Sequence, residues 1–126
     1  MQIDVPAGEV LDRATILTIK LTRLPSAEGQ AHAQRWLSAL ERAWHEAGHG
    51  AFADQPEWDG LLQTNLALWA VEDDLRAAEK REDFGPAFVA DARAVYRLND
   101  QRAALKRQVS ERLNSTLVEQ KSYGDP

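Results

Sequence analysis

Hydrophobic residues recur at three- and four-residue spacing along most of the chain, and prolines and glycines separate the segments that carry this pattern. Such spacing places the hydrophobic side chains on one face of an α-helix. The pattern predicts four helices, over residues 7–24, 26–47, 54–81 and 86–113. Pro25 ends the first because its ring cannot continue a helix, and Gly48 is typical of a helix stop. Asp54 and Glu57 have the spacing of a capping box at the start of the third.

Short connections link these predicted helices, so consecutive helices are expected to fold back on one another. The sequence therefore predicts a single all-α domain over residues 1–126. Its expected architecture is an antiparallel four-helix bundle built from two helical hairpins, the second longer, with short extended segments at residues 2–5 and 116–123.

The two predicted hairpins differ in length. Helices of about 27 residues in the second hairpin span about 40 Å, whereas those of the first span about 30 Å. The second hairpin must therefore overhang the first, and hydrophobic residues in an overhang need a cover. This argument predicts a homodimer that covers Leu75, Phe84 and Phe88 at one end and Leu61, Val109 and Leu113 towards the other.

Composition excludes several classes of protein. The chain has 126 residues, 44% of them hydrophobic, and a net charge of −5, values typical of a folded globular domain. An acidic surface repels nucleic acid, and no hydrophobic run approaches the ~18 residues that span a bilayer. The absence of cysteine excludes disulfides, thiolate metal sites and cysteine nucleophiles. Without a signal-peptide pattern, we expect a cytoplasmic protein that binds neither nucleic acid nor membranes.

Polar residues interrupt the hydrophobic faces of the third and fourth predicted helices. Asn65 and Glu72 lie on the third, and Asn99 and Arg102 lie on the fourth. If the hairpin turns at Phe84, Glu72 faces Asn99, and Asn65 faces Arg102. Opposite net charges favour this register, because residues 57–83 carry −5 and residues 91–112 carry +3.

Two interpretations of these polar residues remain open. The first is a structural seam that fixes the register of the two helices, the best-attested role of buried polar groups. The second is a ligand-binding site formed by Glu72, Arg97, Asn99 and Arg102. There an arginine would bind the carboxylate or phosphate of an anionic metabolite at two points. The seam is favoured because function cannot be assigned from a polar layer in a common fold alone.

The segment His45-Glu46-Ala47-Gly48-His49 matches the H-E-x-x-H motif of zinc hydrolases. In those enzymes the spacing places both histidines on one helical face, and the glutamate activates a zinc-bound water. Gly48 lies inside the motif, where it weakens the helix, and no third ligand follows at an obvious spacing. His45 and His49 are therefore candidate metal ligands, but a solvated helix end is the favoured interpretation.

The turn of the second hairpin carries two aromatic residues, Phe84 and Phe88. They predict either a hydrophobic staple at the start of the fourth helix or an exposed interaction loop. The staple is favoured because Pro86 and the preceding glycine are typical of a helix start that such a contact fixes.

Five segments together carry a resemblance: Val5-Pro6-Ala7-Gly8-Glu9, Thr15-Ile16-Leu17-Thr18-Ile19-Lys20, Asp83-Phe84-Gly85, Val95-Tyr96-Arg97-Leu98-Asn99-Asp100-Gln101-Arg102-Ala103-Ala104-Leu105-Lys106-Arg107 and Lys121-Ser122-Tyr123. They are similar to a family of small bacterial proteins known only as a domain of unknown function. The resemblance extends from Val5 to Tyr123 and is most specific in the predicted fourth helix. Because that family has no assigned activity, the resemblance implies a stand-alone bacterial protein and no catalytic residue.

No nucleophile motif, glycine-rich phosphate loop or cofactor motif is present to favour an enzyme. The sequence therefore favours a non-enzymatic helical module that binds a partner protein or a second copy of itself. The alternatives are a binder or enzyme that acts on a small anionic ligand through Glu72, Asn99 and Arg102, and a zinc hydrolase at His45 and His49.

Overall fold

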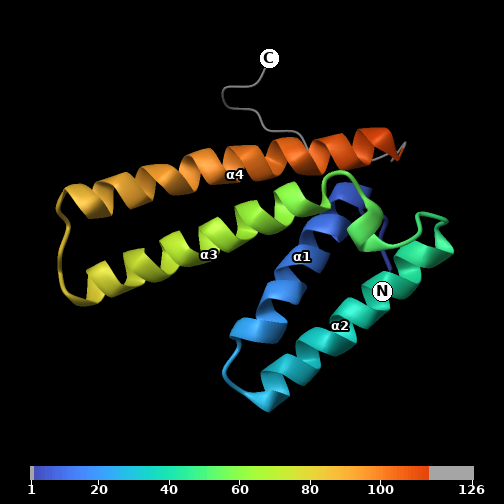
Figure 1. Ribbon diagram of the computed structural model, residues 1–126, viewed down its shortest axis with the longest axis horizontal. Coiled ribbons are helices and arrows are strands. Elements are labelled where there is room, and N and C mark those ends of the chain that lie inside the picture. Colours follow the sequence, from blue (N-terminus) through green and yellow to red (C-terminus); the bar gives the residue numbers. More distant parts are fainter. Residues whose placement is uncertain (1, 114–126) are drawn as a thin grey trace.

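The computed structural model describes residues 2–113, in which the chain forms four α-helices and one short 3₁₀ helix (Figure 1). The α-helices are α1 (Ala7–Arg23), α2 (Ala27–Glu46), α3 (Trp58–Lys80) and α4 (Pro86–Arg112), and the 3₁₀ helix η1 (Phe52–Asp54) precedes α3. No strand occurs among these residues, which confirms the all-α prediction. The predicted extended segment at residues 116–123 lies outside the described residues.

The local signals in the sequence explain where the first hairpin turns. The hydroxyl oxygen of Ser26 accepts a hydrogen bond of 3.0 Å from the backbone N–H of Gly29, which caps the start of α2. α2 ends at Glu46, and Gly48 follows with a φ of +85°. Because residues with a side chain rarely adopt this conformation, the glycine ends the helix as predicted.

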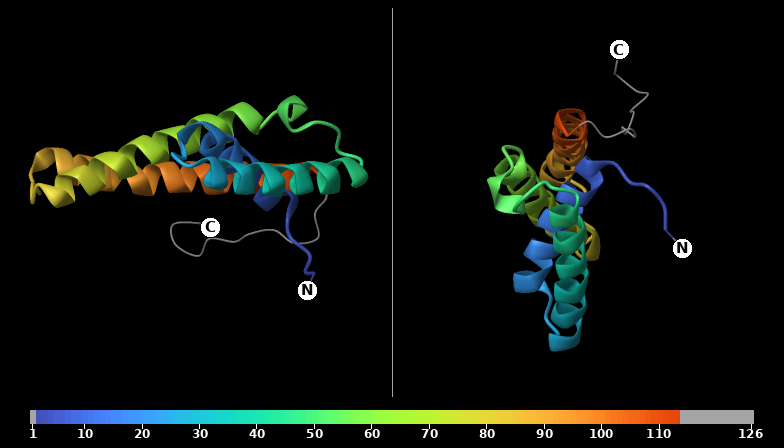
Figure 2. Two further views of the ribbon diagram at one scale, coloured as in Figure 1. Left: turned by 90° about the horizontal axis from the view of Figure 1, so that it is seen from below. Right: turned by 90° about the vertical axis from the view of Figure 1, so that its right-hand side faces the viewer.

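The four helices form two antiparallel hairpins, α1–α2 and α3–α4, that cross one another (Figure 1). α1 packs against α2, α3 and α4, so it joins the two hairpins. Beyond the crossing the hairpins diverge, and the far half of the α3–α4 hairpin lies beside no other helix in Figure 1 or in the left view of Figure 2. The predicted overhang of the longer hairpin is therefore a prominent feature of the molecule.

The hydrophobic core lies where the hairpins cross. Leu11 and Leu17 of α1 are at most 1% exposed, as are Leu61 of α3 and Val109 of α4. The full cluster of buried hydrophobic residues is Ala7, Leu11, Ala14, Leu17, Ala33, Leu37, Trp44, Phe52, Leu61 and Val109. Burial of this cluster stabilises the crossing. None of its residues lies between Leu61 and Val109, so the cluster does not extend into the far half of the α3–α4 hairpin.

The start of α3 differs from the prediction. α3 begins at Trp58 and no side chain caps it, so the predicted capping box of Asp54 and Glu57 is wrong. Asp54 instead ends η1, and Glu57 forms an ion pair with Arg112 of α4. A capping box is a local motif, whereas here the glutamate side chain binds Arg112, which lies on a helix distant in sequence.

None of the helices formed by residues 2–113 is long and apolar enough to cross a membrane.

Candidate functional site

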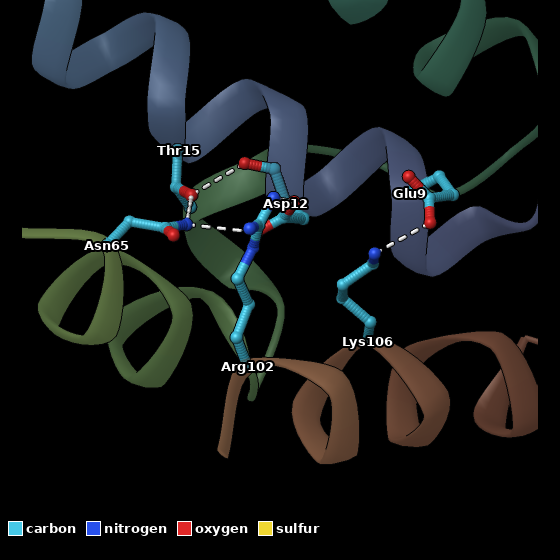
Figure 3. A network of polar contacts seen from close by, with 6 residues as sticks. All are labelled: Glu9, Asp12, Thr15, Asn65, Arg102 and Lys106. Carbon is cyan, nitrogen blue, oxygen red and sulfur yellow. Dashed lines mark hydrogen bonds and ion pairs between the residues drawn. The ribbon is translucent and has the colours of Figure 1, made fainter. Parts of the chain in front are cut away.

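A buried carboxylate joins three helices at the crossing of the hairpins (Figure 3). Arg102 of α4 donates two hydrogen bonds to Asp12 of α1, from Nε to Oδ1 at 2.9 Å and from a terminal nitrogen to Oδ2 at 2.6 Å. Asn65 of α3 donates to the same Oδ1 at 2.9 Å and to the hydroxyl of Thr15 at 2.8 Å. The Thr15 hydroxyl in turn donates to the Asp12 carbonyl at 2.7 Å.

The Asp12 network is satisfied within the protein. Asp12 is 2% exposed, so its charge needs compensation, and the two-point contact with Arg102 is a strong way to supply it. Both carboxylate oxygens already accept hydrogen bonds from the protein. The network therefore acts as a structural joint that fixes how the hairpins cross, and it has the features of such a joint rather than of a ligand site.

Two further contacts tie the first turns of α1 to α4. Lys106 forms an ion pair of 2.7 Å with Glu9 (Figure 3), and the backbone N–H of Gly8 donates a hydrogen bond of 2.9 Å to the hydroxyl of Ser110. α1 and α4 approach so closely here that a Cβ atom on Gly8 would collide with the carbonyl oxygen of Lys106. A glycine is therefore required at this position.

The predicted polar seam between α3 and α4 is correct at Asn65 and Arg102 and wrong at Glu72. Asn65 and Arg102 do meet, because both donate to Oδ1 of Asp12. Glu72 is exposed, so the expectation that it is buried opposite Asn99 or Arg102 is wrong. The physical reason is that α1 covers the α3–α4 pair only near the crossing, and Glu72 lies beyond it.

The four residues of the predicted ligand site differ in their surroundings. Glu72 and Arg97 are exposed, Asn99 is half-buried, and Arg102 is engaged by Asp12. Ligand binding by this set stays a prediction. Because Arg102 already forms an ion pair with Asp12, a structural role explains that residue more simply.

The sequence interpretation missed Asp12, although a signal for it exists. Gly8, Asp12, Thr15 and Ile19 recur at helical spacing and are all buried, so they form a second buried face of α1 beside its leucine-rich face. A carboxylate and a hydroxyl on such a face need polar partners on another helix, and Asn65 was already a candidate.

A second polar cluster fixes the segment that leads into α3. Arg112 of α4 donates to both carboxylate oxygens of Glu57, at 2.9 and 2.7 Å, and to the side-chain oxygen of Gln55 at 2.9 Å. Gln55 donates to the backbone carbonyls of His49 and Ala51, at 2.8 and 3.0 Å. The hydrogen bonds from Arg112 hold the pKa of the Glu57 carboxyl below its ordinary value, against the opposing effect of burial.

The two histidines of the H-E-x-x-H segment do not lie on one helical face. α2 ends at Glu46, so His49 lies outside the helix and packs against Trp44 with ring centroids 4.8 Å apart. His45 is exposed in the last turn of α2. Among residues 2–113, no group of three or more histidine, aspartate or glutamate residues is placed to bind a metal ion. The geometric condition for zinc-hydrolase chemistry is therefore not met, and metal binding by His45 and His49 stays a prediction.

The face of the α3–α4 hairpin that α1 covers continues beyond α1, where no other helix formed by residues 2–113 covers it. On α4, Ser110 bonds to Gly8 of α1, and steps of seven residues lead from it to Ala103, Tyr96 and Val89. Seven residues make two helical turns, so these four residues lie along one face. Their exposure rises from 2% and 8% at Ser110 and Ala103 to 72% and 50% at Tyr96 and Val89.

The same continuation is found on α3. Asn65 bonds to Asp12 and Thr15 of α1, and steps of seven residues lead to Glu72 and Glu79, which are both exposed. The carboxylate of neither glutamate has a hydrogen bond or ion pair with any residue of the described chain. We call the surface formed by Glu72, Glu79, Val89 and Tyr96 the distal face.

The aromatic tip of the hairpin adjoins the distal face. Phe84 and Phe88 contact each other edge to face, with ring centroids 5.2 Å apart. Phe84 nevertheless remains 53% exposed, so it does not close the core, and it lines a shallow hollow together with Val89.

A comparison with protein-family models finds one match, to a family described as "Family of unknown function (DUF6165)", over residues 1–126. No curated protein and no solved structure matches the chain.

Proposed function

The chain belongs to this family of unknown function, and because membership carries no activity, we propose from its geometry that it is a non-enzymatic protein-interaction module. In this proposal the distal face of the α3–α4 hairpin binds a helix of a partner protein. The crossing of the hairpins then serves as a rigid base from which the hairpin projects.

The observation that carries the proposal is the continuity between the covered and the uncovered parts of one face. Near the crossing, α3 and α4 together bind α1 along Asn65, Ala103 and Ser110. Further along, α4 presents Val89 and Tyr96 in equivalent positions, and no helix formed by residues 2–113 covers them. A surface that already accommodates a helix over half its length suits a second helix over the other half, as in helix-in-groove recognition.

The charges on the distal face define the partner helix. Val89 and Tyr96 lie on the α4 side and would pack against an apolar stripe of the partner helix, because exposed aromatic and β-branched side chains gain most from burial. Glu72 and Glu79 lie on the α3 side, seven residues or about 10 Å apart along the helix. The partner is therefore an amphipathic helix with two basic residues, also seven apart, on one edge of its apolar stripe.

A second copy of the chain is the competing occupant, and the distal face argues against it. When a two-fold axis pairs two such hairpins in antiparallel fashion, α3 of one copy packs on α3 of the other. This arrangement brings Glu72 and Glu79 of one copy close to the same residues of the other. Like charges placed opposite one another oppose association. We therefore favour a different protein over the homodimer that the sequence alone suggests.

The proposal is tested with a synthetic helical peptide as the probe. The peptide is about six turns long and carries leucines at helical spacing and two lysines seven apart on one edge of that stripe. Fluorescence anisotropy of the labelled peptide is expected to show saturable binding to the wild-type protein, and Tyr96→Asp is expected to weaken it at least about tenfold.

The matched control is Ala39→Asp, which places the same new charge on an exposed position of α2 away from the distal face. It is expected to leave peptide binding unchanged. Equal weakening by both variants, or no saturable binding to the wild-type protein, would contradict the proposal. A protein mass of twice 14.1 kDa that Tyr96→Asp returns to 14.1 kDa would instead identify a second copy as the occupant.

A further inference from the structure

A cleft on the other hairpin has the features of a small-molecule site. It lies between the C-terminal half of α2 and the segment that leads into α3, and its volume of about 840 Å³ falls within the range of about 300–1,000 Å³ for ligand pockets. Thr18 of α1, Leu37 of α2 and Ala51 of the connecting segment line it together with the aromatic and charged residues described below.

Three aromatic rings form one wall of the cleft. Phe52 and Trp58 are almost parallel, with an angle of 2° between their planes and centroids 5.8 Å apart, and Trp44 packs on Phe52 at 5.3 Å. Trp58 is only half-buried, so part of its ring is available to a ligand. The indole N–H of Trp44 is buried without an acceptor in the described chain.

Charged side chains of both signs line the same cleft. Glu41 and Arg42 are adjacent, exposed residues of α2. The side chain of neither has a hydrogen bond or ion pair within the part of the chain that the structure describes. An arginine offers a two-point contact to a carboxylate, and a glutamate offers an acceptor to an ammonium group.

The rim of the cleft is fixed in place rather than loose. Gln55 is 9% exposed and binds the carbonyls of His49 and Ala51 at the rim, and Arg112 binds Gln55 from α4. A site whose shape exists before the ligand arrives loses less conformational entropy on binding. Buried polar groups thus maintain the opening of the cleft.

We propose that this cleft binds a small molecule that combines a planar aromatic ring with a carboxylate and an ammonium group, as an aromatic amino acid does. The ring packs on the wall formed by Phe52 and Trp58, the carboxylate binds Arg42, and the ammonium group binds Glu41. This ligand class engages both Glu41 and Arg42, whereas an aromatic anion or cation leaves one of the two without a partner. The proposal does not depend on the distal face.

Isothermal titration calorimetry with four probes tests the proposal on the full-length protein. L-Tryptophan carries the ring and both charges, tryptamine lacks the carboxylate, indole-3-propionate lacks the ammonium group, and L-leucine lacks the aromatic ring. L-Tryptophan is expected to bind at least about tenfold more tightly than each of the others, because each of those lacks one of the three contacts.

Two substitutions then assign the charges. Arg42→Gln is expected to reduce the affinity for L-tryptophan to that for tryptamine while leaving the affinity for tryptamine unchanged. Glu41→Gln is expected to reduce the affinity for L-tryptophan to that for indole-3-propionate. Both side chains are exposed and form no hydrogen bond or ion pair with the described residues, so the variants should fold normally. The matched controls are Arg35→Gln and Glu28→Gln, which lie on α2 outside the cleft lining.

Three results would each overturn the proposal. One is the absence of saturable heat with L-tryptophan up to about 10 mM, a limit that corresponds to negligible affinity. Another is an affinity for tryptamine or indole-3-propionate equal to that for L-tryptophan. The third is a loss of L-tryptophan binding in Arg35→Gln or Glu28→Gln as large as that in the cleft variants.

Discussion

Asp12 accepts three side-chain hydrogen bonds, one from Asn65 and two from Arg102, although it is only 2% exposed. Each partner comes from a different helix of the second hairpin, so the carboxylate is the point at which α1 fixes both. Sequence spacing correctly predicts that Asn65 and Arg102 are close. It cannot show that both face an aspartate 53 and 90 residues earlier in the chain, because that contact depends on where α1 crosses α3 and α4.

The first prediction concerns this carboxylate. Asp12→Ala removes the buried acceptor of two hydrogen bonds from Arg102 and one from Asn65, and we expect it to lower the free energy of unfolding by about 3 kcal/mol. Glu72→Ala, which removes an exposed carboxylate on α3, is the control and is expected to change it by less than about 0.5 kcal/mol. Urea denaturation followed by circular dichroism measures both.

The double variant Asp12→Ala/Arg102→Leu sharpens this test. Removing the cation that has lost its buried carboxylate should recover part of the lost stability, so the two substitutions should be non-additive. Strictly additive losses, or a stabilised Asp12→Ala protein, would show that the network is not the joint described above.

A second residue-scale prediction concerns pH. Because Arg112 lowers the pKa of Glu57 in the folded protein, the ion pair contributes its full stability above the ordinary glutamate pKa of about 4.3 and loses it as the pH falls through the lower folded value. Glu57→Gln removes this contribution, which we expect to be about 1–2 kcal/mol because Arg112 stays partly solvated.

Urea midpoints at about pH 6 and about pH 3 measure the effect of that substitution. The wild-type protein should lose more stability than Glu57→Gln between the two values. An identical loss in both proteins would mean that the Glu57–Arg112 pair does not contribute to acid sensitivity.

At the scale of the helices, local signals predict where an element ends but not how elements cross. Ser26, Gly48 and the Gly85–Pro86 pair act on neighbouring residues, so the ends of α1 and α2 and the start of α4 follow from the sequence. The angle between the hairpins instead follows from contacts over long sequence separations, such as Gly8 with Ser110. A bundle pattern is compatible with several crossing geometries, which is why the divergence of the hairpins was not predictable.

The close contact of α1 and α4 gives a prediction at this scale. Gly8→Ala forces a methyl group against the backbone of Lys106, which cannot move aside as a side chain can, so we expect the crossing to be destabilised by about 1–3 kcal/mol. Gly60→Ala is the control, since its new methyl group would meet only the side chain of Leu105, which can shift. Thermal melting compares the two, and an equal or smaller effect at Gly8 would contradict the tight contact.

For the whole molecule, the projecting hairpin is the feature that separates this protein from a closed four-helix bundle. The sequence predicts the overhang from helix lengths alone, and the structure shows which surface the overhang leaves open. The exposed stripe of Val89 and Tyr96 is not evident from periodicity, because both residues continue a face that is buried nearer the crossing. Only the position of α1 separates the covered half of that face from the uncovered half.

The state of association is the first whole-molecule prediction. Because the acidic edges of two distal faces repel, we expect light scattering at tens of micromolar protein to give a mass near 14.1 kDa. A stable mass of twice that value would favour the homodimer that the length of the second hairpin suggests.

The most direct test of the proposed function is an exchange of charges across the distal face. The double variant Glu72→Lys/Glu79→Lys should lose binding of the helical peptide that carries two lysines, and it should bind a peptide in which both lysines are replaced by glutamates. The wild-type protein should show the opposite preference, because each combination then pairs unlike charges. If both proteins prefer the same peptide, the distal face is not where the helix binds.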